Sequence, residues 1–201
     1  MLIVLVFLIG IVAGGVVNAL ADDLPKRRRP QLPRYPDDTP RPFIAWLGIT
    51  AFLFGKRASP NGAKLRWRYP LTEIATALLM VLVVLVTEDD RNIEQTMNTL
   101  QFIFWLIYMP IFVLITVIDL EHRLILFVVI IPSAVIALLD ALLTTYGADL
   151  GEALLGGLLG FFVFFLLYVG GFLFTYVLGK ARGQPIDEVA FGYGDVMLIT
   201  L

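Results

Sequence analysis

The chain has 201 residues, of which 59% are hydrophobic and only 16% are charged. A soluble domain carries closer to a quarter charged residues, so the composition indicates an integral membrane protein, and the net charge of -2 adds little. The absence of cysteine excludes a disulfide framework, a thiolate zinc site and a cysteine nucleophile, and a single histidine makes a multi-histidine metal site unlikely to form.

The first 70 residues contain one predicted transmembrane helix and one long loop. Residues 1–20 form the helix, and we expect it to be retained rather than cleaved, because a basic run at 26–29 follows it closely and resists translocation. Residues 21–70 form a basic, proline-rich loop. Its apolar stretch, 43–54, would make about 18 Å of helix, too short to span a bilayer. We therefore expect this stretch to lie at the membrane interface.

Residues 71–201 form the predicted membrane core. Apolar runs at 71–87, 100–118, 124–143 and 150–179 are each read as a membrane span. A sixth span begins at Gly192 and is incomplete at residue 201. The predicted fold class is therefore an all-α, polytopic transmembrane bundle of at least six spans.

The orientation follows from the basic residues. Eleven of the fifteen Lys and Arg residues lie in the loop 21–70, and only Arg91 falls on the opposite side of the predicted topology. Basic loops stay in the cytoplasm, so the sequence predicts a cytoplasmic loop 21–70 and an N-terminus outside.

Two aspartates stand out at the ends of predicted spans. Asp119 ends the third span, and Asp195 begins the sixth directly after Gly192 and Gly194. The topology predicts both at the cytoplasmic face. Two carboxylates brought together share one proton, so that one can deprotonate a water while the other donates a proton, as in aspartic proteases. The alternative is that each merely caps a helix or is solvated among the lipid headgroups.

Other charged residues have simpler interpretations. We expect Glu121 to be solvated, and His122 and Arg123 to anchor the chain at the headgroups or to orient Asp119. Glu73 is expected to complement the start of the second span. The basic run 26–29 is a membrane anchor that can contact anionic lipid, and it is no evidence for nucleic-acid binding.

At this point four motifs resemble a known family, the bacterial prepilin peptidases or type IV leader peptidases, which are membrane aspartic proteases of the Gly-x-Gly-Asp type. The motifs are Gly14-Gly15-Val16-Val17-Asn18 followed by Leu24-Pro25, Arg68-Tyr69-Pro70-Leu71-Thr72-Glu73, Ile118-Asp119-Leu120-Glu121-His122-Arg123-Leu124-Ile125, and Gly192-Tyr193-Gly194-Asp195-Val196. Each motif alone is weak, but their order along the predicted topology is the family's order.

The resemblance implies that Asp119 and Asp195 are the catalytic pair, and that Gly192 and Gly194 form the supporting loop. Glu73, His122 and Arg123 are then the candidates that support the pair. The implied substrate is the leader of a type IV prepilin or pseudopilin, cleaved at the cytoplasmic face of the bacterial inner membrane. The lipid bilayer is the other implied partner, and no nucleic acid is implied.

Some positions depart from the family pattern. The family's cytoplasmic loop often carries two CxxC pairs that bind zinc, whereas this chain has no cysteine. We therefore expect no zinc, and a loop held by packing through 43–54. Proteolysis needs no cofactor, while S-adenosylmethionine is implied only if the methyltransferase activity of many members is retained. Asp22 and Asp23 stand near the family's usual Arg, and Met197 stands where a Lys is common.

Two other functions fit the same composition. One is a non-catalytic, truncated relative that binds pilins, which would bind substrate without cleaving it. The other is a small membrane transporter. Carriers place their acids near the bilayer midplane, whereas both aspartates here are predicted at one face, so the peptidase is the favoured interpretation.

Overall fold

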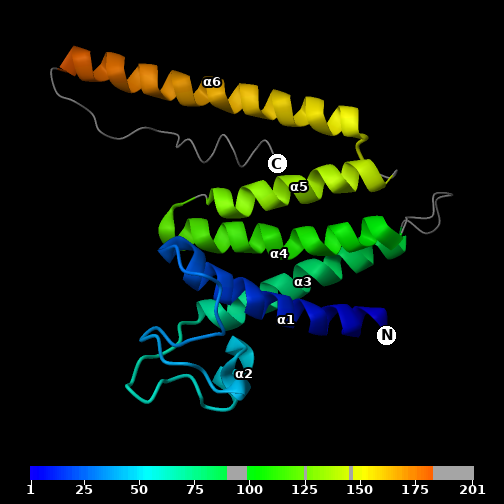
Figure 1. Ribbon diagram of the computed structural model, residues 1–201, viewed down its shortest axis with the longest axis vertical. Coiled ribbons are helices and arrows are strands. Elements are labelled where there is room, and N and C mark those ends of the chain that lie inside the picture. The colour runs from blue at the N-terminus through cyan, green and yellow to red at the C-terminus, as the bar shows by residue number, and fades with distance from the viewer. Residues whose placement is uncertain (90–98, 125, 145–146, 183–201) are drawn as a thin grey trace. The chain divides into compact units, whose positions relative to one another are not determined.

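The computed structural model describes residues 1–89, 99–124, 126–144 and 147–182 (Figure 1). Over these residues the chain is helical, and its strand-like pairing is limited to two isolated bridges, Arg34 with Pro40 and Ala58 with Lys64. The predicted all-α fold is therefore confirmed for the described part of the chain. The chain divides into two compact units, Met1–Leu124 and Ile125–Leu201.

Four helices in the described ranges are long and apolar enough to cross a membrane. They cover Leu2–Lys26, Arg68–Thr87, Thr99–His122 and Leu150–Gly171. Large apolar side chains remain exposed along all four, as expected for surfaces that face lipid. The chain is thus a membrane protein with several helical spans, while its orientation and the total number of spans stay predictions. The sixth predicted span, 192–201, lies outside the described residues.

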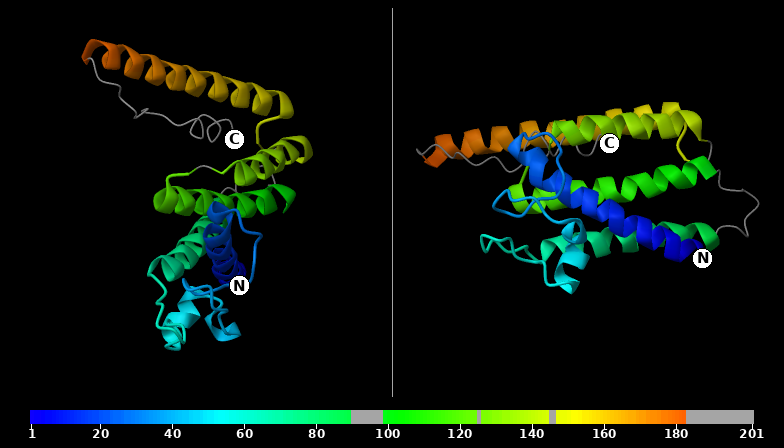
Figure 2. Two further views of the ribbon diagram at one scale, coloured as in Figure 1. Left: turned by 60° about the vertical axis from the view of Figure 1, so that its left-hand side comes forward. Right: turned by 60° about the horizontal axis from the view of Figure 1, so that its bottom comes forward.

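Three long helices form the first unit: α1 (Leu2–Asp23), α3 (Arg68–Asp89) and α4 (Thr99–His122). The buried residues of α1 recur every three or four positions, which places them on one stripe of the helix. Two of them are Gly10 and Gly14. A methyl group would lie 2.5 Å from the Cα of Ala77 at the first and 2.5 Å from the Cα of Glu73 at the second. These glycines let α1 and α3 pack backbone to backbone (Figure 2).

The loop between α1 and α3 carries three short helices: η1 (Leu24–Lys26), η2 (Phe43–Ala45) and α2 (Gly48–Leu53). The stretch 43–54 is therefore not one continuous helix, because Leu47 adopts an extended conformation between η2 and α2. The loop packs around its own small core, as predicted for a loop without cysteines. The buried residues of this core are Tyr35, Ala45, Ala51, Leu65 and Tyr69.

Polar contacts add to this core. The carboxylate of Asp37 accepts hydrogen bonds of 2.6 Å from the hydroxyls of Ser59 and Thr39. These bonds lower the pKa of Asp37 to about 2, with the bond from Ser59 the largest cause. The hydroxyl of Tyr35 donates to the carbonyl of Lys56 at 2.7 Å. Side chains thus join the two halves of the loop.

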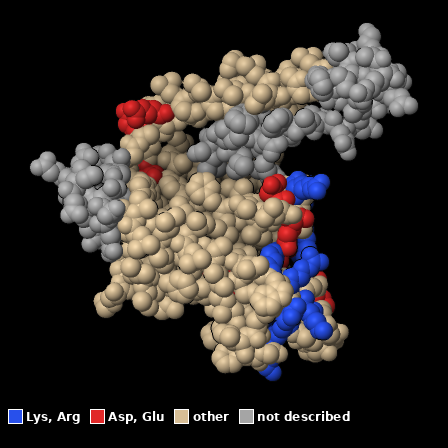
Figure 3. All heavy atoms as spheres, turned by 180° about the vertical axis from the view of Figure 1, so that it is seen from behind, with Lys and Arg blue, Asp and Glu red and all other residues tan. Residues whose placement is uncertain are grey.

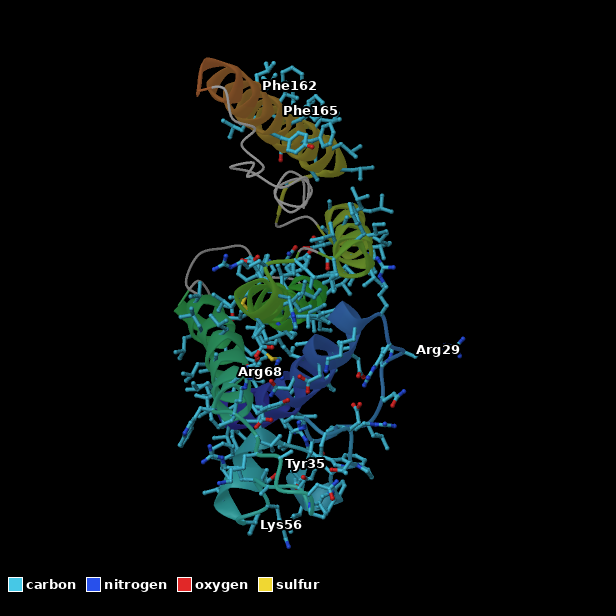
Figure 4. The ribbon with its side chains drawn as sticks, turned by 90° about the vertical axis from the view of Figure 1, so that its left-hand side faces the viewer. Arg29, Tyr35, Lys56, Arg68, Phe162 and Phe165 are labelled. Atoms are coloured by element: carbon cyan, nitrogen blue, oxygen red, sulfur yellow. The ribbon has the colours of Figure 1, made fainter. Side chains whose placement is uncertain are left out.

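The second unit contains α5 (Phe127–Leu143) and α6 (Leu150–Arg182). With 17 residues α5 is about 26 Å long, somewhat less than the hydrocarbon thickness of a bilayer. It is shorter than the predicted span 124–143 because Leu126 is extended and α5 begins only at Phe127. At the start of α6, the Asp149 carboxylate accepts the backbone N–H of Glu152 at 2.7 Å, and the Glu152 carboxylate accepts that of Asp149 at 3.3 Å, in a capping box. Phe162 and Phe165 are exposed on α6 (Figure 4).

Candidate active site

Asp119 lies in the last turn of α4. The preceding residue, Ile118, is buried in the first unit, whereas Asp119 is exposed. The helix ends shortly afterwards at Arg123, whose φ of 50° is left-handed and whose N–H donates to the Asp119 carbonyl at 2.7 Å. Among the described residues, no side chain forms an ion pair with the Asp119 carboxylate. The carboxylate is therefore accessible at the end of the helix.

Charged side chains of the first unit gather at this end of its helices, as Figure 3 shows from behind. Arg68, at the start of α3, is central to them. Its Nη2 donates to Asp22 of α1 at 2.5 Å, and its Nη1 donates to Glu121 of α4. The Arg68 side chain is only 14% exposed, and it lies among the helices (Figure 4). One guanidinium thus joins the ends of all three helices.

Two further side chains complete this ion cluster, which we define as Asp22, Arg41, Arg68, Tyr69 and Glu121. Arg41 comes from the loop and lies 3.9 Å from Asp22, with its guanidinium 4.4 Å from the centre of the Tyr69 ring. Burial lowers the pKa of Arg41, but a guanidinium stays charged at any physiological pH. The Tyr69 hydroxyl donates to Asp22 at 2.9 Å. The cluster therefore fixes the loop as well as the helix ends.

The position of Glu121 adds to one prediction. The residue is exposed, as expected for a solvated side chain, but its carboxylate also binds Arg68, which lies 53 residues earlier in the chain. The helix α4 continues past the predicted end of its span at Ile118 to His122. This extra turn carries Glu121 to the start of α3, where the guanidinium compensates its charge.

Glu73 has a more specific role than predicted. Its carboxylate is fully buried and accepts the N–H groups of Gly48 at 2.5 Å and Ile49 at 2.8 Å, together with a 3.4 Å bond from Asn18 Nδ2. Gly48 and Ile49 are the first residues of α2. Glu73 therefore accepts hydrogen bonds from the N–H groups that are left free at the start of α2, rather than from those at the start of its own helix. Its observed partners do not include Asp119.

The remaining predicted residues are placed as follows. His122 is exposed and lines a pocket beside the ion cluster, and Arg123 is exposed at the end of α4. Gly192, Gly194 and Asp195 lie outside the described residues, so the pairing of Asp119 with Asp195 stays a prediction. Within the described ranges, no group of three His, Asp or Glu residues is arranged to hold a metal ion.

The ion cluster was missed in the sequence, although signals for it were present. Asp22 was noted only as a departure from the family pattern, and Arg68 only as part of a motif. Both lie at predicted helix ends on the same side of the membrane, as does Glu121. Opposite charges at helix ends on the same side are the signal that would have suggested this contact.

Comparison with known proteins bears on the site as a whole. Residues 106–201 match the type IV leader peptidase family. The matched segment includes Asp119 on α4 and continues through α5 and α6 to the residues around Asp195. Over this segment the chain is similar to the type IV leader peptidases, which are a family of proteases. No curated protein and no solved structure matches the chain.

Proposed function

We propose that this protein is a membrane aspartic endopeptidase in which Asp119 and Asp195 act as a pair. The observation that carries the proposal is the family match over residues 106–201, because it contains both aspartates. The exposure of Asp119 at the end of α4 supports it, since a catalytic carboxylate must reach a peptide bond outside the helix. Gly192 and Gly194 would give the chain before Asp195 the freedom to approach that bond.

Water is the nucleophile in this mechanism. One carboxylate of the pair takes a proton from the water, and the other gives a proton to the leaving amine. The pair holds a single proton between its members, so the roles of acid and base belong to the pair rather than to either residue. No metal ion and no covalent intermediate are needed.

The proposed substrate is the leader of a type IV prepilin or pseudopilin, cleaved at the cytoplasmic face of the bacterial inner membrane. This face is supported by the distribution of Lys and Arg, eleven of which lie in the loop 21–70. The ion cluster and the last turn of α4 lie at the end of the first unit from which this loop emerges. N-methylation of the product, with S-adenosylmethionine as donor, is a second activity to be tested with it.

The test is cleavage of a prepilin by the purified full-length protein, compared with Asp119→Asn and Asp195→Asn. Both variants should lose cleavage by about three orders of magnitude or more. Asp149→Asn is the matched control, because Asn also caps helices well and Asp149 lies at the start of α6 outside the motifs. Retained cleavage in either catalytic variant would overturn the mechanism. Binding without cleavage by the unmodified protein would favour the non-catalytic relative.

Adding S-adenosylmethionine to the same reaction tests the second activity. The mass of the cleaved product then shows whether a methyl group has been transferred. A product of unchanged mass would limit the function to proteolysis.

The orientation has a separate test, because the chain has no native cysteine. Single cysteines at two exposed positions, Lys56→Cys in the loop and Asp149→Cys before α6, can be labelled with a membrane-impermeant maleimide. In intact cells we expect label at position 149 only, and at both positions after permeabilisation. Label at position 56 in intact cells would reverse the predicted orientation.

A further inference from the structure

A pocket of about 200 Å³ lies beside the ion cluster, wholly within the first unit. The end of α1, the loop that follows it, the start of α3 and the end of α4 all contribute to its wall. Its polar and charged lining residues are Asp22, Asp23, Lys26, Gln31, Arg34, Tyr35, Asp38, Arg66, Arg68, Tyr69, Glu121 and His122. Asp119 is not among the residues of this wall.

The acids of the wall are already engaged. Asp22 and Glu121 bind Arg68, and the N–H of Gln31 donates to Asp23 at 2.9 Å. Asp38 pairs at 2.7 Å with Arg28, which lies outside the wall. Arg41, also outside the wall, adds a second cation beside Asp22. The wall holds four acids and four cations. Arg28 and Arg41 add two cations beside its acids, so this region carries an excess of positive charge.

Three of those cations are Lys26, Arg34 and Arg66. None of them forms an ion pair within 4.0 Å with an acid in the described part of the chain. All three are exposed to solvent at the pocket. Asp38 of the same wall attracts Lys26 and Arg34, but the cations in and beside the wall outnumber its acids, so a bound anion would balance the remaining positive charge.

Arg68 adds a donor to the same wall. Its two Nη atoms bind Asp22 and Glu121, but its buried Nε has no hydrogen-bond partner among the described residues. A buried donor without a partner is unfavourable. Guanidinium groups match the oxygens of a phosphate in geometry as well as in charge. The exposed guanidinium groups of Arg34 and Arg66, which also line the pocket, therefore offer both charge and hydrogen-bond donors to a phosphate.

The position of the pocket indicates where that phosphate comes from. The pocket lies where three apolar helices end and the basic loop begins, which is the depth of lipid headgroups. Basic pockets between membrane helices bind the headgroups of anionic lipids. Leu32, which also lines the pocket, is 66% exposed and offers an apolar contact. We propose that this pocket binds the phosphate of an anionic phospholipid headgroup.

The test measures lipid binding by the full chain rather than peptidase activity. The protein is reconstituted in nanodiscs of phosphatidylcholine that contain increasing amounts of phosphatidylglycerol. Its thermal stability is measured, and the lipid that it retains is identified by native mass spectrometry. We expect phosphatidylglycerol to raise the Tm and to be retained preferentially. In Arg34→Gln/Arg66→Gln, affinity should fall roughly 20- to 30-fold, because each cation near an anionic headgroup contributes about 1 kcal/mol.

The matched control is Lys56→Gln/Lys64→Gln, which removes the same charge from the same loop and leaves the basic run 26–29 unchanged. Neither residue lines the pocket, and Lys56 lies apart from Arg68 in Figure 4. This control should keep the preference for phosphatidylglycerol to within about threefold, because charges away from the site are screened by salt. If both double variants lose the same affinity for phosphatidylglycerol, the proposed binding pocket is wrong, and the lipid is attracted by the general positive charge of the loop.

Two further arms complete the test. Inorganic phosphate is added to the protein in phosphatidylcholine nanodiscs, and a rise in Tm equal to that with phosphatidylglycerol would overturn lipid as the source of the phosphate. The second variant pair, Lys26→Gln/Arg66→Gln, should reproduce the loss seen with the first pair. If this second variant binds phosphatidylglycerol as tightly as the unmodified protein does, Lys26 and Arg66 do not bind the phosphate and the proposal is wrong.

Discussion

Arg68 at the start of α3 binds Glu121 in the last turn of α4, and Glu121 lies two residues beyond Asp119. The same guanidinium binds Asp22 at the end of α1. Both side chains of the Arg68–Glu121 pair are largely shielded, at 14% and 28% exposed. Removing one partner of a shielded pair leaves the other charge without compensation. The pair therefore determines where the end of α4, and with it Asp119, is held.

The first prediction concerns this pair. Arg68→Gln and Glu121→Gln should each lower stability and reduce kcat for cleavage, with little change in KM, because the end of α4 is no longer fixed. In a double-mutant cycle the two changes should be non-additive by about 0.5–3 kcal/mol in the free energy of unfolding. Asp38→Asn is the control, since the Asp38–Arg28 pair is exposed and such pairs contribute little. Additive effects would show that the contact does not couple the helices.

The second prediction concerns the buried carboxylate of Glu73. Glu73→Gln replaces one of the acceptors of Gly48 and Ile49 with an amide donor, so it should lower the free energy of unfolding by about 1.5–3 kcal/mol. The loop should also become more sensitive to limited proteolysis, because α2 loses the group at its start. Glu152→Gln is the matched control, because Gln also serves in a capping box. Unchanged protease resistance in Glu73→Gln would contradict this role.

The third prediction concerns the contact of α1 with α3. Gly14→Ala places a methyl group 2.5 Å from the Cα of Glu73, and backbone cannot move aside as a side chain can. We expect a loss of about 1–3 kcal/mol in stability. Gly156→Ala in α6 is the control, since its methyl group would meet no described atom within 4 Å. Thermal unfolding in detergent measures both, and equal Tm values for the two variants would argue against close packing at Gly14.

The fourth prediction concerns pH and Asp37. Because its folded-state pKa is lowered from 3.8 to about 2 by hydrogen bonds from Ser59 and Thr39, its contribution to stability is present above about pH 4 and is lost as the pH falls toward 2. Protease sensitivity of the loop should therefore rise over this interval. Asp37→Asn should be less stable at neutral pH and should lose this part of the pH dependence. An unchanged acid profile in that variant would assign the effect to another carboxylate.

The sequence by itself determined the fold class and the long apolar helices, and its motifs indicated the resemblance to the type IV leader peptidases. These features depend on composition and on runs of apolar residues. Both can be recognised within one segment of the sequence, without knowing which other segments it contacts in the fold. The motif around Asp119 and the Gly192-Tyr193-Gly194-Asp195 motif are local in the same sense. The sequence also predicted that the cysteine-free loop is held by packing, because its aromatic and aliphatic residues have no other way to be buried.

Only the tertiary structure decided which residues meet. Glu121 was expected to be solvated, and it is exposed, but its carboxylate also binds a guanidinium from the start of another helix. Glu73 was expected to complement the start of its own helix, but the N–H groups that donate to it belong to α2. A charge at a helix end is stabilised by whichever opposite charge or free N–H group the packing brings within hydrogen-bonding distance. That distance depends on how α1, α3 and α4 pack, and the packing depends on glycines far from either carboxylate in the chain.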